Sequence, residues 1–177
     1  MDFEEKTLST KYVYNGKVLD VKRDEVLISN GHKSIREVVE HSGGVVILAI
    51  KDNKFLAVEQ FRYPLKETSI ELPAGKLEPG EDPDIAAKRE LIEETGYIAN
   101  NWDYLGFIYT TPGFCDEKLH LYLARDLEYK QQNPDEDEII HAMEIDSDEF
   151  YKMILNGNIN DSKTICTICR ARGFIND

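Results

Sequence analysis

Residues 75–98 gather many of the side chains in this chain that could do chemistry. The segment reads GKLEPGEDPDIAAKRELIEETGYI and combines a run of carboxylates with one arginine and three glycines. Carboxylate and carbonyl oxygens are the ligands that Mg²⁺ and Mn²⁺ prefer, and a cation held by them keeps positions open for phosphate oxygens and water. The segment therefore predicts a divalent-metal site suited to diphosphate chemistry.

The second half of this segment is predicted to form a helix over residues 83–95. Asp82 followed by Pro83 is typical of a helix N-terminus, and Gly96 is typical of a left-handed C-terminal stop. At about 100° per residue, one arc of this helix carries the residues expected to pack inward, namely Ile85, Leu91, Ile92 and Thr95. The opposite arc carries three acids, Glu90, Glu93 and Glu94.

Three acids on one helical face are unfavourable for stability alone. Like charges three or four residues apart each cost about 0.2–0.5 kcal/mol, and acids near the C-terminal end of a helix oppose its macrodipole. A bound divalent cation reverses the sign of this effect, and Arg89, at the edge of the acidic arc, can pair with one of the acids or orient it. The alternative is an ordinary solvated acidic face. The spacing of the acids from Gly75 and Glu81 would then also be a coincidence.

That spacing resembles the sequence signature of the Nudix hydrolase family. Gly75, five residues, Glu81, seven residues and then RELIEETG follow the pattern G-x5-E-x7-R-E-U-x-E-E-x-G-U, in which U is a bulky aliphatic residue. Tyr97 departs from the last position of the pattern, where an aromatic ring can fill the same packing slot. The resemblance implies hydrolysis of a nucleoside diphosphate linked to another group.

Segments outside the signature are similar to the ADP-ribose pyrophosphatase branch of the family. They are EQFRYP at 59–64, ELPAG at 71–75, YTTPGFCDE at 109–117 and the acidic loop DEDE at 135–138. The resemblance implies Mg²⁺-dependent hydrolysis of ADP-ribose to AMP and ribose 5-phosphate. The alternatives are hydrolysis of another nucleoside diphosphate derivative, a house-cleaning nucleotide hydrolase and, in a different class, a non-catalytic ADP-ribose-binding sensor.

The resemblance also implies roles for individual residues. Two or three ions of Mg²⁺ or Mn²⁺ are expected, with ligands from the Ala74 carbonyl, Glu90, Glu94 and Glu93. The catalytic set comprises a candidate general base and the residues around it, namely Glu138, Glu136, Glu93 and Arg89. The substrate-binding set comprises Arg62, Arg36, Glu117 and Pro112. Acidic loops and surface arginines also occur without such roles, so a solvated loop and ordinary ion pairs remain the alternatives for these last two sets.

Hydrophobic periodicity predicts the elements that position these residues. Short alternating runs between residues 11 and 40, with an Asn30-Gly31 turn, indicate an antiparallel meander. A buried central strand is expected at 45–50, with its hairpin partner at 55–61. Further on, we expect strands at 104–109, 118–124 and 139–145, a mobile surface loop at 127–138, and helices at 148–155 and 162–172.

These elements predict an α+β fold, a Nudix-type α/β/α sandwich with a mixed sheet that follows an N-terminal antiparallel β meander. We divide the chain into residues 1–42, the meander, and 43–177, the catalytic domain. A small meander cannot bury both of its faces alone. In the resembled branch such a segment packs across a two-fold axis and helps to build the partner's substrate pocket, so a homodimer is expected.

Composition limits the partners. The formal net charge of −13 disfavours a nucleic acid as the main partner, because no basic patch is evident in the sequence. No segment has the length of a membrane span or the pattern of a signal peptide, so a cytoplasmic protein with a small-molecule substrate is expected. Cys166 and Cys169 have the C-x-x-C spacing but no second pair, so packing or incidental thiols are favoured over zinc or redox use.

Overall fold

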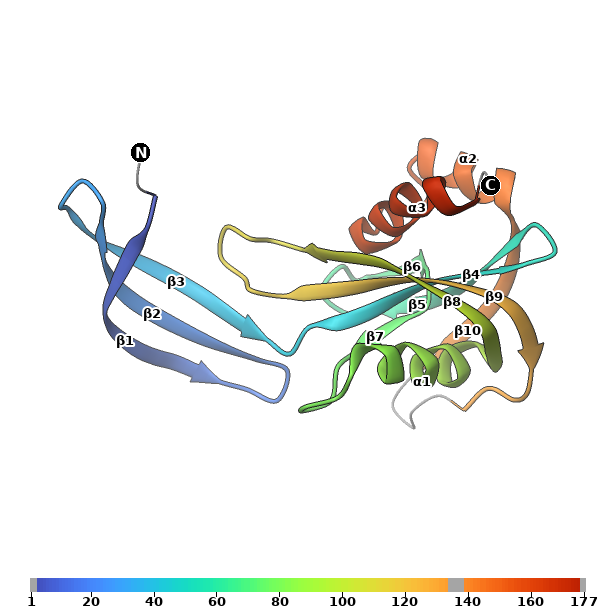
Figure 1. Ribbon diagram of the computed structural model, residues 1–177, viewed down its shortest axis with the longest axis horizontal. Helices are drawn as coiled ribbons and strands as arrows, with labels where there is room; N and C mark the ends of the chain where they lie inside the picture. Colours follow the sequence, from blue (N-terminus) through green and yellow to red (C-terminus); the bar gives the residue numbers. More distant parts are fainter. Residues whose placement is uncertain (1–2, 134–138, 176–177) are drawn as a thin grey trace. The chain divides into compact units, whose positions relative to one another are not determined.

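The computed structural model describes residues 3–133 and 139–175 and divides into two compact units (Figure 1). One unit contains β1 (Glu5–Asn15), β2 (Leu19–Ile28) and β3 (Lys33–His41), together with the segment Tyr109–Lys118. The other unit contains Gly44–Ile108 and the chain from Leu119 onward.

The first unit is the predicted antiparallel meander, in the order β1-β2-β3. The turn between β2 and β3 closes where Gly31 donates to the Ile28 carbonyl at 2.8 Å, with Gly31 at a φ of +86°, a conformation that favours glycine. β2 continues without a break from Leu19 to Ile28, so it is longer than the short alternating runs expected between residues 11 and 40. Every residue of β1 is exposed, which leaves this edge of the sheet uncovered in the single chain.

The second unit is built on one mixed sheet. Its main path is β10-β5-β4-β9-β8, with β6 paired to β5 and β7 paired to β4. The strands are β4 (Gly44–Lys51), β5 (Lys54–Arg62), β6 (Glu67–Glu71), β7 (Ala74–Lys76), β8 (Tyr97–Tyr109), β9 (Lys118–Tyr129) and β10 (Ile140–Asp146). The β4–β9 pair is parallel, whereas β4 pairs with β5 and β7 in the antiparallel sense.

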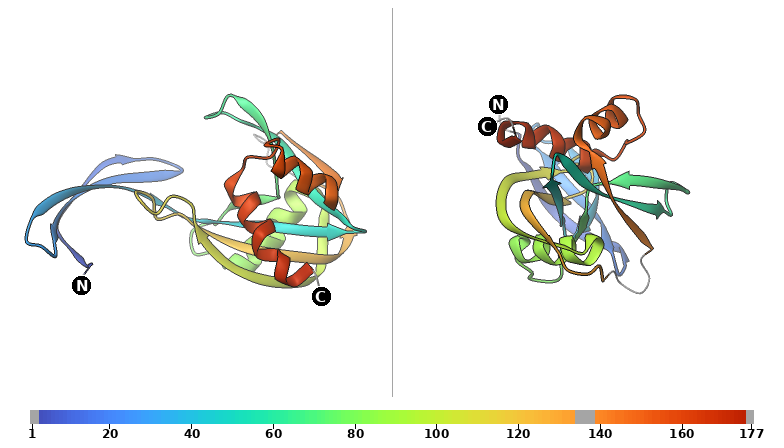
Figure 2. Two further views of the ribbon diagram at one scale, coloured as in Figure 1. Left: turned by 90° about the horizontal axis from the view of Figure 1, so that it is seen from above. Right: turned by 90° about the vertical axis from the view of Figure 1, so that its right-hand side faces the viewer.

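Helices cover both faces of this sheet, with α1 (Pro83–Thr95) on one side and α2 (Ser147–Leu155) and α3 (Ser162–Ile175) on the other (Figures 1 and 2). β4 is buried on both faces, and its side chains alternate between two cores. Val46 and Leu48 belong to the core that contains Phe150 of α2, whereas Ile47 belongs to the core that contains Leu91 of α1. The predicted α/β/α sandwich is confirmed.

Some boundaries differ from those predicted. β9 continues to Tyr129, so the first residues of the expected 127–138 loop are strand. The strand persists because Leu127 packs on the α1-side core and the Tyr129 ring meets Tyr97 edge-on at 5.2 Å. β8 begins at Tyr97 rather than residue 104, and residues 134–138 lie outside the described residues. In the parts of the chain that the structure describes, no helix is both long and apolar enough to cross a lipid bilayer.

Candidate active site

Helix α1 has the predicted ends, and Leu91 and Thr95 are buried as predicted, but the rest of its inward face differs from the prediction. Asp82 caps it by accepting a hydrogen bond from the Asp84 N–H at 2.8 Å, and Gly96 ends it in the left-handed conformation. Ile85, expected to pack inward, is 62% exposed. Glu90 and Glu94, expected on the side opposite the apolar arc, are only 9% and 3% exposed.

Small residues explain this orientation. The buried positions of α1 are Ala86, Ala87, Glu90, Leu91, Glu94 and Thr95. Alanine side chains bring the helix close to the sheet, and at that distance the two acids face the sheet as well. A count of large apolar residues therefore assigned too much weight to Ile85 and too little to the two alanines.

The backbone of β7 receives the two buried acids. A Cβ atom on Gly75 would lie 1.9 Å from the carboxyl carbon of Glu90, so only glycine leaves room for that carboxylate. Next to it, the Ala74 N–H donates to Glu94 Oε2 at 2.9 Å. The preceding carbonyl, that of Pro73, accepts from the Ile47 N–H at 2.9 Å, which ties this segment to the central strand β4. Both carboxylates are thus fixed against residues 74 and 75.

Arg89 joins three of the acids in the signature. Its Nε and Nη2 donate to the two oxygens of Glu81, each at 2.9 Å, and its Nη1 donates to Glu90 at 2.8 Å and to Glu93 at 2.9 Å. The hydrogen bonds from Arg89 lower the pKa of the Glu81 carboxyl. The pKa of Arg89 itself is raised, and the largest cause is its hydrogen bonding to Glu81. The predicted pairing of Arg89 with the acids is therefore present, and it fixes the direction of Glu90 and Glu93.

An Arg89→Lys variant is expected to lose about 10–100-fold in activity at limiting metal, the usual cost of losing a residue that orients a metal ligand. Lysine keeps the charge but cannot make the two-oxygen fork to Glu81 while it also reaches Glu90 and Glu93. The measurement is turnover against Mg²⁺ concentration, with Arg172→Lys on the exposed end of α3 as the matched control. A metal dependence equal to that of the unmodified protein would contradict the orienting role.

The residues around Gly75 fit a hard divalent cation. Two nearly buried carboxylates one helical turn apart need positive charge near them, and all the donors here are oxygens. Residues 3–133 and 139–175 contain no group of three Asp, Glu, His or Cys side chains that could hold an ion by themselves. A cation here would therefore use Glu90 and Glu94 with the Ala74 carbonyl, water and phosphate oxygens.

Arg62 lies in the same unit as these acids. Its Nε donates to Glu71 Oε1 at 2.7 Å and its Nη2 to Glu71 Oε2 at 2.5 Å, while its side chain keeps 36% exposure. The pKa of Arg62 is raised, mainly by the hydrogen bonds to Glu71, against burial and with smaller contributions from the charges of Asp161 and Glu94. The sequence analysis included Glu71 in the segment at 71–75 but assigned it no role.

The other residues expected to bind substrate lie in the first unit. Arg36 pairs with both oxygens of Glu5, at 2.8 and 2.5 Å. Glu117 accepts a hydrogen bond from the Thr110 hydroxyl at 2.7 Å, and Pro112 is exposed in the same loop. Glu136 and Glu138 fall outside the described residues.

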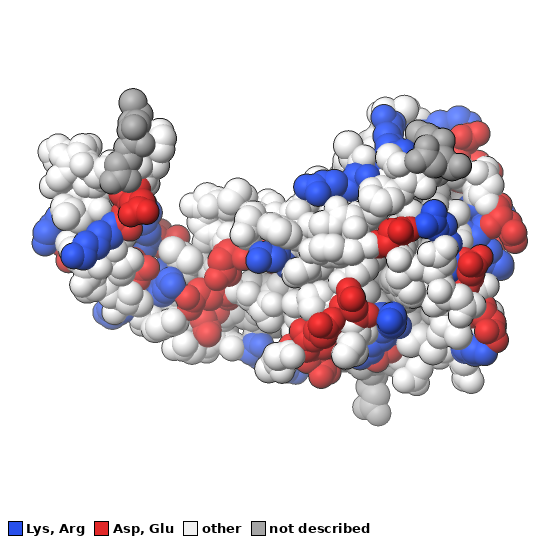
Figure 3. All heavy atoms as spheres, viewed as in Figure 1, with Lys and Arg blue, Asp and Glu red and all other residues white. Residues whose placement is uncertain are grey.

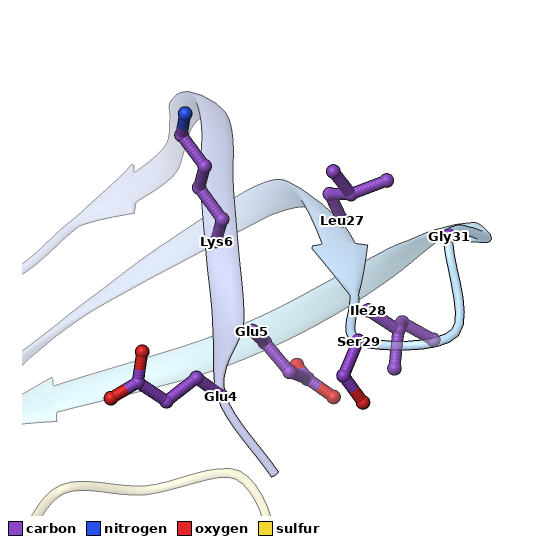
Figure 4. A pocket seen from close by; sticks show the side chains of 7 residues that line it. All are labelled: Glu4, Glu5, Lys6, Leu27, Ile28, Ser29 and Gly31. Atoms are coloured by element: carbon purple, nitrogen blue, oxygen red, sulfur yellow. The ribbon is translucent and has the colours of Figure 1, made fainter. Parts of the chain in front are cut away.

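A hollow of about 460 Å³ lies in the meander, and Glu5, the partner of Arg36, is one of its lining residues (Figure 4). Its lining comes from the start of β1 with the residue before it, and from the end of β2 with the following turn, namely Glu4, Glu5, Lys6, Leu27, Ile28, Ser29 and Gly31. In the space-filling view, acidic side chains gather over the segment that leads into α1, with Lys or Arg side chains at the edge of this group and no large basic patch among the described residues on this face (Figure 3). That charge distribution suits a small ligand carried with a cation better than a nucleic acid.

Comparison with known proteins identifies the family. Residues 40–167 match the NUDIX domain, and residues 5–39 match the nucleoside diphosphate sugar hydrolase N-terminal domain. Since the first match spans most of the chain, the chain belongs to the Nudix family of hydrolases, whose members generally need a divalent metal.

Individual relatives cover nearly the whole chain. A methanol dehydrogenase activator from Bacillus methanolicus is 44% identical over 94% of this chain and 91% of its own length. An ADP-ribose pyrophosphatase from Bacillus subtilis (strain 168) is 42% identical over 93% of this chain and 91% of its own length. A crystal structure of an ADP compounds hydrolase, 20% identical, matches the fold with a TM-score of 0.88 over 99% of this chain and 97% of that one.

Proposed function

We propose that this protein hydrolyses the diphosphate of ADP-ribose to AMP and ribose 5-phosphate, with Mg²⁺ as the physiological metal. The observation that carries the proposal is the burial of Glu90 and Glu94 against the backbone of Ala74 and Gly75. The ADP-ribose pyrophosphatase at 42% identity spans both the meander and the sandwich, which supports this choice of substrate.

Each residue then has a defined task. Glu90 and Glu94, with the Ala74 carbonyl, hold the metal, and two or three ions are proposed in all. A bound divalent cation neutralises the charge that develops on the phosphoryl oxygens. Arg89 keeps Glu90 and Glu93 oriented through its hydrogen bonds to both. Arg62 is proposed to bind the diphosphate of the substrate.

Glu138, with Glu136 beside it, is proposed as the general base. Both lie outside the described residues, but the residues that flank them support the proposal. The Asn133 N–H donates to the Glu93 carbonyl at 3.1 Å, and the Gln132 side chain donates to the Glu94 carbonyl at 2.6 Å and to the Ile140 carbonyl at 3.5 Å. Gln132 and Asn133, which precede the acidic segment, are therefore hydrogen-bonded to the C-terminal end of α1, and Ile140, which follows it, is hydrogen-bonded to Gln132.

A Glu138→Gln variant is expected to lower kcat by about 10²-fold with KM nearly unchanged, because the amide keeps the shape but cannot take a proton from water. Steady-state kinetics on ADP-ribose give both constants, and Glu128→Gln, at an exposed position of β9, is the control. An unchanged kcat would mean that Glu138 is not the general base and that one of the acids of α1 has this role.

The substrate proposal is tested with a panel of nucleotides assayed with and without Mg²⁺. The panel contains ADP-ribose, ADP-glucose, NADH, a dinucleoside polyphosphate and 8-oxo-dGTP. ADP-ribose should have the highest kcat/KM, and AMP and ribose 5-phosphate should be the products. Brisk cleavage of another compound without ADP-ribose turnover would refute the substrate and leave the hydrolase chemistry in place. Binding without cleavage of any compound would favour a sensor.

We also propose a homodimer located in the cytoplasm, in which Arg36, Pro112 and Glu117 of the first unit contribute to substrate binding. The support is the uncovered β1 edge, whose Val13 and Tyr14 are 55% and 57% exposed. Light scattering at working concentration should give twice the chain mass, and a monomer would refute the assembly.

Activation of a methanol dehydrogenase is a second candidate, favoured by the name of the relative at 44% identity. The two candidates are compatible if the hydrolysed diphosphate belongs to a dinucleotide cofactor. Addition of the protein to a methanol dehydrogenase, with the Glu94→Gln variant in parallel, tests this candidate. Stimulation that survives the substitution would separate activation from hydrolysis.

A further inference from the structure

The carboxylate of Glu71 is the centre of a buried ion-pair network. Glu71 is 2% exposed and receives two hydrogen bonds from Arg62. Lys163, from the first turn of α3, donates to the same Oε2 that accepts from Arg62 Nη2. Two cations from distant parts of the sequence therefore share one carboxylate, and the side chain of Lys163 is itself only 15% exposed.

The first turn of α3 also holds the strand segment that leads to the metal site. Lys163 Nζ lies 3.0 Å from Asp161 Oδ1, and Asp161 Oδ2 accepts from the Thr164 N–H at 2.9 Å, as a helix cap does. The fully buried Thr164 hydroxyl accepts from the Leu72 N–H at 2.8 Å. Residues 71 and 72 are thus fixed by α3, directly before Pro73 and the Ala74–Gly75 backbone that receives the acids.

The charges decide what Lys163 contributes. Burial raises the pKa of the Glu71 carboxyl, but the hydrogen bonds from Arg62 and the charge of Lys163 outweigh burial and lower the pKa to about 2. Glu71 is therefore ionised at neutral pH. Lys163 is also paired with Asp161, so its contribution is to hold the Glu71 carboxylate in place, and the two-oxygen fork from Arg62 then fixes the plane of the guanidinium.

We propose that Lys163 is a positioning residue for substrate binding: it shares the Glu71 carboxylate with Arg62, and so keeps that carboxylate, and through it the Arg62 guanidinium, oriented toward the diphosphate. The proposal rests on the substrate-binding role proposed for Arg62. It assigns to α3, on the opposite face of the sheet from α1, a part in the affinity for the diphosphate.

The test is the effect of Lys163→Met on KM and kcat, measured on the compound from the nucleotide panel with the highest kcat/KM. KM should rise about tenfold with kcat nearly unchanged, because a lost binding interaction that does not change at the transition state acts on KM. Lys163→Arg, which keeps the charge and a donor, should restore KM to within about twofold. Lys152→Met on the exposed face of α2 is the matched control.

A double-mutant cycle between Lys163 and Glu71 separates a positioning role of Lys163 from a purely structural one. It also avoids leaving the buried Glu71 carboxylate without Lys163. In a Glu71→Gln background, Lys163→Met should give no further rise in KM, because the shared carboxylate is gone. Arg62→Met, run in parallel, should raise KM at least as much as Lys163→Met. A raised KM for Arg62→Met with an unchanged KM for Lys163→Met would overturn the proposal and leave the function intact. Unchanged KM for Arg62→Met, or equal effects of Lys163→Met with and without Glu71, would also overturn it.

Discussion

A Glu94→Gln variant is expected to lose at least about 10³-fold in kcat, and Glu90→Gln a similar factor, because each removes a ligand charge worth several kcal/mol in the transition state, where about 1.4 kcal/mol is tenfold. Glutamine keeps the shape of the side chain. Its carbonyl oxygen can still accept from the Ala74 N–H at position 94, or from Arg89 Nη1 at position 90, so the fold should persist.

Thermal unfolding provides a measurement other than activity. Mg²⁺ should raise the Tm of the unmodified protein, since a ligand that binds only the folded state stabilises it. The same addition should raise the Tm of either variant much less. Glu149→Gln on the exposed side of α2 is the matched control and should keep both the activity and the Mg²⁺ shift. Full magnesium-stimulated activity in the Glu90→Gln and Glu94→Gln variants would rule out the metal site.

The elements that local signals define were predictable from the sequence. The ends of α1 follow from Asp82, Pro83 and Gly96, whose backbone preferences act within one turn of the helix. The continuous apolar run at 45–50 correctly predicted β4, because a strand covered on both faces has no polar side. The pairing of Arg89 with acids followed from positions on one helix.

The features that depend on close approach between distant segments were not predictable in the same way. The inward face of α1 depends on how near Ala86 and Ala87 bring the helix to β7. Hydrophobic periodicity indicates which residues share a face of the helix, but it does not give the distance between the helix and the sheet. The Glu71–Lys163 pair joins β6 to α3 across many intervening residues, and neither residue stands in a pattern that indicates the other. Single charged residues become informative only when the fold places them together.

A Gly75→Ala variant should lose about 10³-fold in kcat, the same order as Glu90→Gln, because the added methyl group takes the place of the Glu90 carboxylate. The Cβ atom would lie 1.9 Å from the Glu90 carboxyl carbon and 1.9 and 2.2 Å from its oxygens, so that side chain must move by more than about 1 Å, a misplacement that already costs about 10²-fold. Loss of the ligand position accounts for the rest. Gly173→Ala in α3, where nothing lies within 4 Å of the added atom, is the matched control and should retain full activity.

Truncation of Glu90 shows whether the clash acts through that side chain. In a Glu90→Ala background the atoms that the Gly75 methyl group would meet are gone, so Gly75→Ala should then cost less than about threefold more activity. Non-additivity of this size means that Gly75 serves the reaction by leaving space for one carboxylate. Additive losses would instead mean that the glycine is needed for the path of β7 itself, and the close approach of Glu90 to residue 75 would not explain why glycine stands at this position.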